Sequence, residues 1–226
     1  MGSSKRYFFL AATLGQGGAE KQFYYLVKAM VRQGHNIVVG CFASGEFWQP
    51  ALEALGVRVV HLDAVGKLGR LRQLYKLIKL IKPELVFSMH FYSNFYLALP
   101  ARLLGIKAIG SIRGNGYHEY HELGYMLAAV CYYTPHRVLA NSAHGSANMK
   151  KIFPMGKAAQ VFENSIDTSD YAPVGLKTVP EVPVLLLIAR LVPLKRAELF
   201  LQLLEKLTEM GHSITGVVVG YGPEED

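Results

Sequence analysis

The sequence predicts an α/β protein built on a parallel sheet, with helices on both faces of the sheet. Short apolar runs alternate with helix-patterned segments along the whole chain, which is typical of βαβ units. A glycine-rich turn follows the first apolar run, at residues 13–20. The alternation starts again at Val184, after a stretch that contains three prolines, so a second unit of the same kind is expected there.

The chain opens with a predicted strand at residues 7–12, the glycine-rich turn, and a helix pattern that ends at Gly34 as a C-cap. This order is the opening of a nucleotide-binding βαβ unit. Gly15 and Gly17 match the start of G-x-G-x-x-G, but Glu20 holds the third glycine position, which argues against a Rossmann dehydrogenase. Gly17 and Gly18 let the backbone approach a ligand and offer N–H groups to an oxyanion; the alternative is a plain tight turn.

Further strands and helices follow in alternation before residue 165. The predicted strands cover 36–43, 57–62, 84–90, 108–112, 137–141 and 160–162, and predicted helices cover 47–55, 66–82 and 92–104.

The helix at 66–82 carries one apolar and one basic face. The apolar face holds Leu68, Leu71, Leu74, Tyr75, Ile78 and Ile81. Arg72, Lys76 and Lys79 line the opposite face, with no acidic residue between Asp63 and Glu84. Two interpretations stay open: a crossover helix with a solvated basic side, or a peripheral contact with anionic lipid headgroups.

The sequence gives little support for a metal site or for disulfide bonds. His118 and His121 stand three residues apart among carboxylates, a weak pattern from which we expect no metal site. Cys41 and Cys131 lie far apart, in no spacing typical of zinc ligands or a disulfide framework. A reducing, cytoplasmic setting is therefore expected.

Composition and charge point to an anionic partner. The chain has 226 residues, 51% of them hydrophobic, and a net charge of +7. Residues 1–165 hold 19 basic and 8 acidic side chains, whereas residues 166–226 hold 5 and 9. No zinc-finger spacing or RNP-like strand indicates nucleic-acid binding, so a phosphorylated substrate or a membrane surface is favoured. The first apolar run is too short for a secretory signal, and no run reaches the ~18 residues of a membrane span.

The stretch from Val184 to Arg196 predicts a strand buried on both faces, followed by a loop rich in cations and a helix over residues 195–210. Arg190 and Lys195 would stand at the carboxyl end of the strand, where α/β sheets bind ligands; the alternative is an ordinary βα turn. A last strand is predicted at 215–220. We expect a first domain over 1–168, a linker over 169–183 and an incomplete second unit over 184–226, because two strands are too few for a stable sheet.

Six short motifs resemble, in their order, those of family 4 glycosyltransferases with the two-domain GT-B fold. They are Gly17-Gly18-Ala19-Glu20, His90, Asn141-Ser142, Asn164-Ser165-Ile166-Asp167, Ala189-Arg190-Leu191 with Lys195, and Gly220-Tyr221-Gly222-Pro223-Glu224. The resemblance implies a retaining transferase that moves a sugar from a UDP- or GDP-linked donor to a glycan or lipid-linked acceptor. It implies no metal or other cofactor. The chain would be the Rossmann-like N-terminal domain plus a truncated second Rossmann-like unit.

The resemblance also implies roles for individual residues. Arg190 and Lys195 would neutralise the donor diphosphate, and Gly17 and Gly18 would bring N–H groups to that diphosphate or to the acceptor. Where relatives carry Thr-x-His-Gly, this chain has Ser-Ile-Arg-Gly at 111–114, so Arg113 or His118 would have to replace the histidine. The family's Glu-x7-Glu signature does not occur, and we expect it beyond Asp226.

Two alternatives to a complete transferase remain. The chain could be a non-catalytic or split-subunit protein that binds acceptor or membrane while another polypeptide supplies the donor domain. It could also be a GT-B epimerase or phosphorylase. The expected location is cytoplasmic, with peripheral contact at the inner face of the plasma membrane.

Overall fold

The computed structural model describes residues 4–171, 175 and 180–225. The chain divides into two compact units, Met1–Asp170 and Tyr171–Asp226, and each is described by itself. Of the linker predicted at 169–183, residues 172–174 and 176–179 lie outside the described residues.

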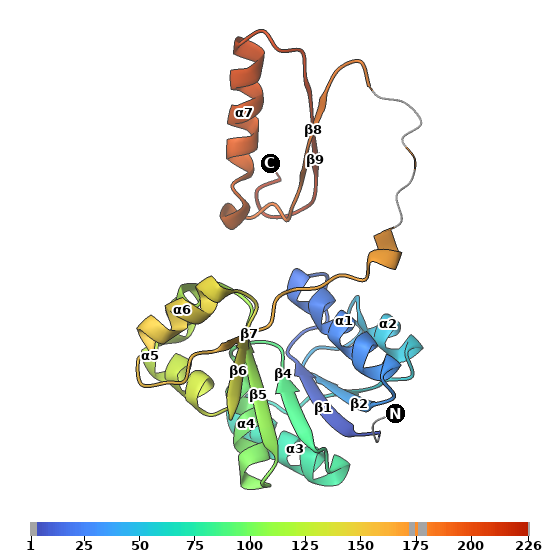
Figure 1. Ribbon diagram of the computed structural model, residues 1–226, viewed down its shortest axis with the longest axis vertical. Coiled ribbons are helices and arrows are strands. Elements are labelled where there is room, and N and C mark those ends of the chain that lie inside the picture. The colour runs from blue at the N-terminus through green and yellow to red at the C-terminus, as the bar shows by residue number, and fades with distance from the viewer. Residues whose placement is uncertain (1–3, 172–174, 176–179, 226) are drawn as a thin grey trace. The chain divides into compact units, whose positions relative to one another are not determined.

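The first unit is built on a seven-stranded sheet whose paired strands are all parallel (Figure 1). The strands are β1 (Arg6–Ala11), β2 (Asn36–Cys41), β3 (Arg58–His61), β4 (Leu85–Ser88), β5 (Lys107–Ile112), β6 (Arg137–Ala140) and β7 (Gln160–Val161). Their order is β3-β2-β1-β4-β5-β6-β7. The direction of winding reverses between β1 and β4, and such a switch point is where open α/β sheets bind ligands.

Helices connect the strands of this sheet. They are α1 (Gly18–Arg32), α2 (Gln49–Ala54), α3 (Gly66–Ile81), α4 (Ser93–Leu103), α5 (Tyr117–Tyr133) and α6 (Ala143–Ile152), followed by the 3-10 helix η1 (Thr168–Tyr171). Helix α5 was not predicted from the sequence, and neither was α6. Its N-cap is Ser142, whose hydroxyl accepts a hydrogen bond from the Gly145 N–H at 3.1 Å.

The hydrophobic core lies on both faces of the sheet, which confirms the predicted α/β architecture. Phe9 packs on one face with Phe23 of α1, and the adjacent Phe8 packs on the other with Leu74 of α3 and Leu97 of α4. Neighbouring residues of a strand point to opposite faces, so a strand covered on both faces needs a continuous apolar run. The sequence Tyr-Phe-Phe-Leu-Ala at residues 7–11 of β1 satisfies this need.

Helix α3 confirms part of the predicted amphipathic pattern. Leu74 and Ile78 are buried against the sheet, and Arg72, Lys76 and Lys79 are exposed. The prediction is wrong for Leu68, which is 70% exposed because the first turn of α3 extends beyond the core.

The second unit contains β8 (Val184–Ile188), the 3-10 helix η2 (Pro193–Lys195), α7 (Ala197–Glu209) and β9 (Thr215–Val219). β8 and β9 pair in parallel, with α7 beside them (Figure 1). Gly216, the register partner of Leu185, lies against Leu204 of α7.

The prediction that the strand starting at Val184 is buried on both faces is wrong in this unit. Val184, Leu186 and Ile188 are exposed, the last at 71%, while Leu185 and Leu187 are half-buried. The reason is that α7 covers one face of the two-stranded sheet. All five residues of β8 are apolar, but only every second side chain is covered, because the other face of the strand is exposed.

Candidate active site at the carboxyl edge of the sheet

Three strands of the first unit end in chemically distinctive residues at the switch point. β1 runs into the glycine-rich turn, β4 runs into His90, and β5 runs into Arg113. Because these strands are parallel neighbours, their carboxyl ends meet at one edge of the sheet. Residues far apart in the sequence are thereby brought together.

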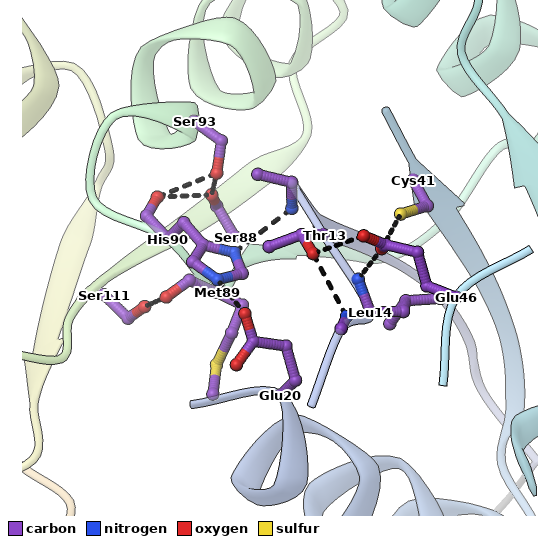
Figure 2. Close-up of polar contacts among 12 residues, drawn as sticks. Thr13, Leu14, Glu20, Cys41, Glu46, Ser88, Met89, His90, Ser93 and Ser111 are labelled. Atoms are coloured by element: carbon purple, nitrogen blue, oxygen red, sulfur yellow. Dashed lines mark hydrogen bonds and ion pairs between the residues drawn. The ribbon is translucent and has the colours of Figure 1, made fainter. Parts of the chain in front are cut away.

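The two ring nitrogens of His90 connect the end of β4 to the residue that follows β1 and to α1 (Figure 2). Its Nδ1 accepts a hydrogen bond from the Ala12 N–H at 3.1 Å, and its Nε2 lies 3.2 Å from Oε1 of Glu20. With Nδ1 accepting, the proton of a neutral imidazole resides on Nε2, which then donates to the Glu20 carboxylate. The pair fixes the tautomer of His90 and its orientation at the edge of the sheet.

The backbone at His90 is also held firmly. Its carbonyl oxygen accepts hydrogen bonds from Ser88 Oγ at 3.3 Å and Ser93 Oγ at 2.7 Å, and the two hydroxyls lie 2.7 Å apart (Figure 2). These contacts connect the end of β4 to the first turn of α4. The imidazole is therefore presented from a rigid turn.

Gly17 is the N-cap of α1, and it must be glycine because of Glu20. A Cβ at Gly17 would collide with the Glu20 carboxylate, which is engaged by His90. A Cβ at Gly18 would meet nothing within 4 Å, so space remains above the first residue of α1. The Gly17 N–H donates to the Gly15 carbonyl oxygen at 3.0 Å, so an anion at the open N-terminus of α1 would meet the N–H groups from Gly18 onward.

Glu46, from the segment between β2 and α2, fixes the glycine-rich turn from the other side. Its Oε1 accepts a hydrogen bond from Thr13 Oγ1 at 2.7 Å, and its Oε2 accepts one from the Leu14 N–H (Figure 2). Thr13 Oγ1 accepts a further hydrogen bond from the Gly15 N–H at 3.1 Å. The sequence analysis missed Glu46, because its partners lie 32 and 33 residues away and leave no local pattern.

Arg113 projects from the end of β5 into a cavity of about 210 Å³ that it shares with His90 and Tyr92. Its Nε is buried without a hydrogen-bond partner, and Nη1 lies 3.5 Å from Asn164 Oδ1. Burial lowers the pKa of Arg113 to about 10. The guanidinium is thus a cation with unused donors, facing the same edge as His90.

Among the described residues no carboxylate forms an ion pair with Arg113, although Glu119 and Glu122 line the same cavity. Both Glu119 oxygens accept backbone N–H bonds, from Gly114 at 2.8 Å and Gly116 at 2.9 Å. The Glu119 carboxylate therefore shapes the loop after β5 and makes no ion pair with Arg113. A buried cation without a partner is costly, and a bound anion would remove that cost.

Asn141, at the end of β6, supports Arg113 through the backbone. Its Nδ2 donates to the Arg113 carbonyl oxygen at 3.0 Å, while its Oδ1 is buried without a partner. An unpaired donor on Arg113 and an unpaired acceptor on Asn141 therefore occur on neighbouring strands. Such unsatisfied polar atoms are typical of ligand sites.

His118, the other candidate for the missing histidine, is exposed on α5. Its Nε2 lies 3.3 Å from Glu122 Oε1, one turn along the helix, and it does not line the cavity of Arg113. In the part of the chain that the structure describes, no group of three or more His, Cys, Asp or Glu side chains is arranged to hold a metal ion.

The motif at residues 164–167 contacts α1, the helix that follows the glycine-rich turn. Gln22 makes two hydrogen bonds with the backbone of Ser165, each 2.8 Å long. Asp167 pairs with Lys28 at 2.9 Å and with Arg32 at 3.1 Å. The Ser169 hydroxyl and Lys28 hold the pKa of Asp167 well below its usual range. This motif is therefore an anchor for the segment that leaves the first unit.

In the second unit, Arg190 follows β8 and Lys195 ends η2, just before α7. Both side chains are exposed, and among the described residues neither forms an ion pair with a carboxylate. The next cation, Arg196, is paired with Glu198 at 3.3 Å. Arg190 and Lys195 are thus two free cations at the carboxyl end of a strand and the N-terminal end of a helix.

Two glycines hold the backbone around Arg190 in place. A Cβ at Gly220 or Gly222 would collide with the carbonyl groups of Ala189 and Leu191, which flank Arg190. The Leu191 N–H donates to the Tyr221 carbonyl oxygen at 2.9 Å. The segment after β9 therefore needs glycine to pack directly against the loop that carries Arg190.

The geometry at this edge agrees with a sequence-family match. The family model described as Glycosyltransferase Family 4 matches residues 16–170, a span that begins in the glycine-rich turn and includes His90, Arg113 and Asp167. This chain belongs to Glycosyltransferase Family 4. No curated protein matches the chain.

Solved structures place this family member in the GT-B fold. Anabaena Alr3699/HepE, in complex with UDP and glucose, matches 96% of this chain and 61% of its own length with a TM-score of 0.75 and 18% identity. The lipopolysaccharide outer core galactosyltransferase WaaB matches with a TM-score of 0.59 and 18% identity, over 97% of this chain and 62% of its own. A putative UDP-N-acetylglucosamine 2-epimerase from Listeria monocytogenes matches with a TM-score of 0.61 and 12% identity, over 97% and 62%.

These comparisons confirm the expected family and the Rossmann-like architecture. The chain spans about three fifths of the length of the HepE chain in the complex with UDP and glucose. At identities of 12–18% the likeness is one of fold.

Proposed function

We propose that this chain contributes the acceptor-side domain and a diphosphate-binding segment to a retaining glycosyltransferase. The enzyme would transfer a sugar from a nucleotide-sugar donor to a glycan or lipid-linked acceptor. One observation carries the proposal: in a family 4 chain, the open N-terminus of α1, the Glu20–His90 pair and the uncompensated Arg113 meet at one edge of the sheet. We assign residues 1–168 to the acceptor-side domain, 169–183 to the linker and 184–226 to the donor side.

The donor is proposed to be linked to UDP or GDP. Structures of HepE contain UDP, UDP-glucose, or UDP with glucose, and this chain shares their fold. Arg190 and Lys195 are the proposed partners of the donor diphosphate, because they are free cations at a strand end followed by a helix. Charge-assisted hydrogen bonds to the departing diphosphate stabilise the transition state as the bond to the sugar breaks.

In the first unit, the N–H groups near Gly17 and Gly18 are proposed to meet the diphosphate or the acceptor. Arg113 is proposed as the cation near the reacting sugar, with His118 as the alternative. Of the two, Arg113 is better placed, because it shares a cavity with His90, whereas His118 is exposed and paired with Glu122. In the reaction, the acceptor hydroxyl forms the new glycosidic bond and its proton leaves with the diphosphate.

A transfer assay with the native protein tests this function. Purified protein is incubated with UDP- and GDP-sugars, with and without a glycolipid fraction, and nucleotide release and product linkage are measured. Acceptor-dependent release with an unchanged anomeric configuration supports the proposal; inversion would contradict the retaining mechanism. Conversion of the donor sugar without acceptor would favour an epimerase, and activity only with a copurifying second chain would favour a split enzyme.

We propose a cytoplasmic location with peripheral contact at the inner face of the plasma membrane. Among the described residues, no helix has the length and apolarity needed to cross a bilayer. The exposed Arg72, Lys76 and Lys79 of α3 would attract anionic headgroups.

A further inference from the structure

A second hollow lies at the opposite end of the sheet, where β6 and β7 begin. It has a volume of about 400 Å³ and is formed by the last turns of α4 and α5 and by the segments that lead into the two strands. Four of its lining residues are basic: Arg102, His136, Arg137 and Lys157. No acidic side chain lines it. We call it the β6–β7 pocket.

The electrostatics of the β6–β7 pocket favour an oxyanion. The sequence holds no aspartate or glutamate from residue 123 to residue 162. Among the described residues, no carboxylate forms an ion pair with Arg102, Arg137 or Lys157. The three cations around the pocket repel one another, and a bound anion would offset this repulsion.

Two of the basic side chains are also pre-oriented. Arg102 donates from Nε to the Thr134 carbonyl oxygen and from Nη2 to the Pro135 carbonyl oxygen, which leaves N–H groups unused at its tip. His136 accepts a hydrogen bond at Nδ1 from the Ala108 N–H at 3.0 Å, so the neutral ring carries its proton on Nε2 as a donor. Burial, and then Arg102 and Lys107, lower the pKa of His136.

An exposed apolar stripe adjoins the pocket. Helix α5 is kinked at Gly124, where φ is 72°, and its second half exposes Met126, Val130 and Tyr133. These residues are three or four positions apart and share one side of the helix. Met126 is 83% exposed, and Met155, which lines the pocket with Tyr133, is 91% exposed. Apolar side chains thus border the cationic hollow.

We infer that the β6–β7 pocket and the α5 stripe form a docking site for an anionic phospholipid bilayer. A headgroup phosphate would bind Arg102, Arg137 and Lys157, while Met126, Val130 and Tyr133 enter the boundary with the acyl chains. Interfacial binding needs both an apolar face and cations that meet anionic lipid, and this surface provides both. A nucleic acid would use the cations but would leave the apolar stripe without a role.

Helix α3 has a supporting part in this arrangement. Arg72 and Lys76 border an apolar groove between α3 and α4 that ends at Leu103, and the preceding residue, Arg102, lines the β6–β7 pocket. The last turn of α4 therefore joins the two hollows. The cations of α3 add general attraction to the bilayer, whereas the pocket holds a headgroup.

Vesicle cosedimentation of the full chain tests this inference. Vesicles of phosphatidylcholine alone are compared with vesicles that contain phosphatidylglycerol, and binding is expected only to the latter. The double substitution Arg137→Gln/Lys157→Gln is expected to weaken binding about 30-fold, because each basic residue near an anionic surface contributes about one kcal/mol. Met126→Ser/Val130→Ser should weaken it as well, without changing its dependence on salt. The matched control, Arg72→Gln/Lys76→Gln/Lys79→Gln, should have the smaller effect although it removes one more charge.

Three results would overturn the docking site. Binding by the Arg137/Lys157 variant equal to that of the unmodified chain excludes the pocket. A larger loss in the α3 triple variant assigns the contact to α3. Competition by duplex DNA, with no effect of the serine substitutions, assigns the surface to nucleic acid. All substituted side chains are half-buried or exposed on the surface, and circular dichroism verifies the fold of each variant. No donor or acceptor enters the experiment, so its result is separate from that of the transfer assay.

Discussion

Glu20 and His90 are 70 residues apart in the sequence, but Glu20 Oε1 lies 3.2 Å from His90 Nε2. The contact joins the first turn of α1, the helix that follows β1, to the end of β4. Strands β1 and β4 flank the switch point of the sheet. Gly17 makes room for the carboxylate, and the Ala12 N–H occupies the other ring nitrogen. The pair therefore sets the shape of the glycine-rich turn and the tautomer of the histidine together.

Gly17→Ala should break this pair. The new Cβ would collide with the Glu20 carboxylate, so either the carboxylate or the turn must move. Overpacking of this kind costs about 1–3 kcal/mol of unfolding free energy. NMR of ¹⁵N-labelled histidine should show His90 losing its fixed Nε2–H tautomer, and donor-dependent activity should fall with it.

Gly18→Ala is the matched control for this substitution. It adds the same methyl group one residue further along, where nothing lies within 4 Å. Its stability and its His90 signals should match those of the unmodified protein. Equal effects of the two substitutions would show that the Glu20–His90 pair does not depend on the space at Gly17.

Arg113→Met should stabilise the protein while it reduces transfer. The substitution removes a half-buried cation that forms no ion pair among the described residues, and it keeps the approximate length of the side chain. A gain of about 1–3 kcal/mol in unfolding free energy is expected, as for other buried charges replaced by apolar groups. Urea unfolding and the transfer assay measure the two effects, and Arg113→Lys, which keeps the charge, is the control.

The stability gain of Arg113→Met should not vary with pH between about 6 and 9. Burial lowers the pKa of Arg113 from 12.5 to about 10, so the side chain is protonated in both the folded and the unfolded state below pH 10. The cost of the buried charge is then constant, and it fades only as the pH rises above 10. A lower unfolding free energy for the methionine variant would show that Arg113 is compensated in the folded protein.

The alternation of apolar runs and helix patterns was sufficient to predict the sheet of the first unit. Its central strands β1 and β4 are covered on both faces, and they therefore carry continuous apolar runs. The same rule failed at β8, because a run of apolar residues does not reveal how many helices cover it. Helix α6 was missed because few of its residues are apolar, and its signal is the N-cap at Ser142.

The candidate site was only partly visible in the sequence. Short motifs drew attention to Gly17, His90 and Arg113, and the structure brings His90 and Arg113 to one cavity. Glu20 was noted as a departure from a glycine pattern and as the last residue of a family motif, but without a role, and in the structure it holds His90. Glu46 could not be predicted, because an acidic residue in a loop has no periodicity and its partners, Thr13 and Leu14, lie in the turn after β1.

Asp167→Asn should weaken the attachment of the 164–167 motif to α1. The substitution removes the charge that pairs with Lys28 and Arg32. Because the pKa of Asp167 is held below its ordinary value of 3.8, its stabilising effect is complete above that value and is lost as the pH falls below it. Urea unfolding should therefore separate the variant from the unmodified protein at pH 7, and the difference should shrink between about pH 4 and pH 2.

Glu163→Gln provides the control for Asp167→Asn. This neighbouring acid is exposed, and among the described residues it makes no ion pair. It should leave stability unchanged across the same pH range. A pH-independent effect of Asp167→Asn would show that the hydrogen bonds of Ser165 with Gln22, and not the charges, hold the motif.

Arg190→Ala and Lys195→Ala test the proposed diphosphate site in the transfer assay. Each is expected to lower kcat about 10²–10³-fold, because charge that develops on the leaving diphosphate would lose a positioned donor. The two effects should not add, since both cations would act on the same group. Neither change should affect folding, because both side chains are exposed and unpaired among the described residues. Lys206→Gln, which removes an exposed cation from α7, is the matched control and should retain full activity. Unchanged kcat in both alanine variants would remove the diphosphate assignment, even if transfer itself were demonstrated.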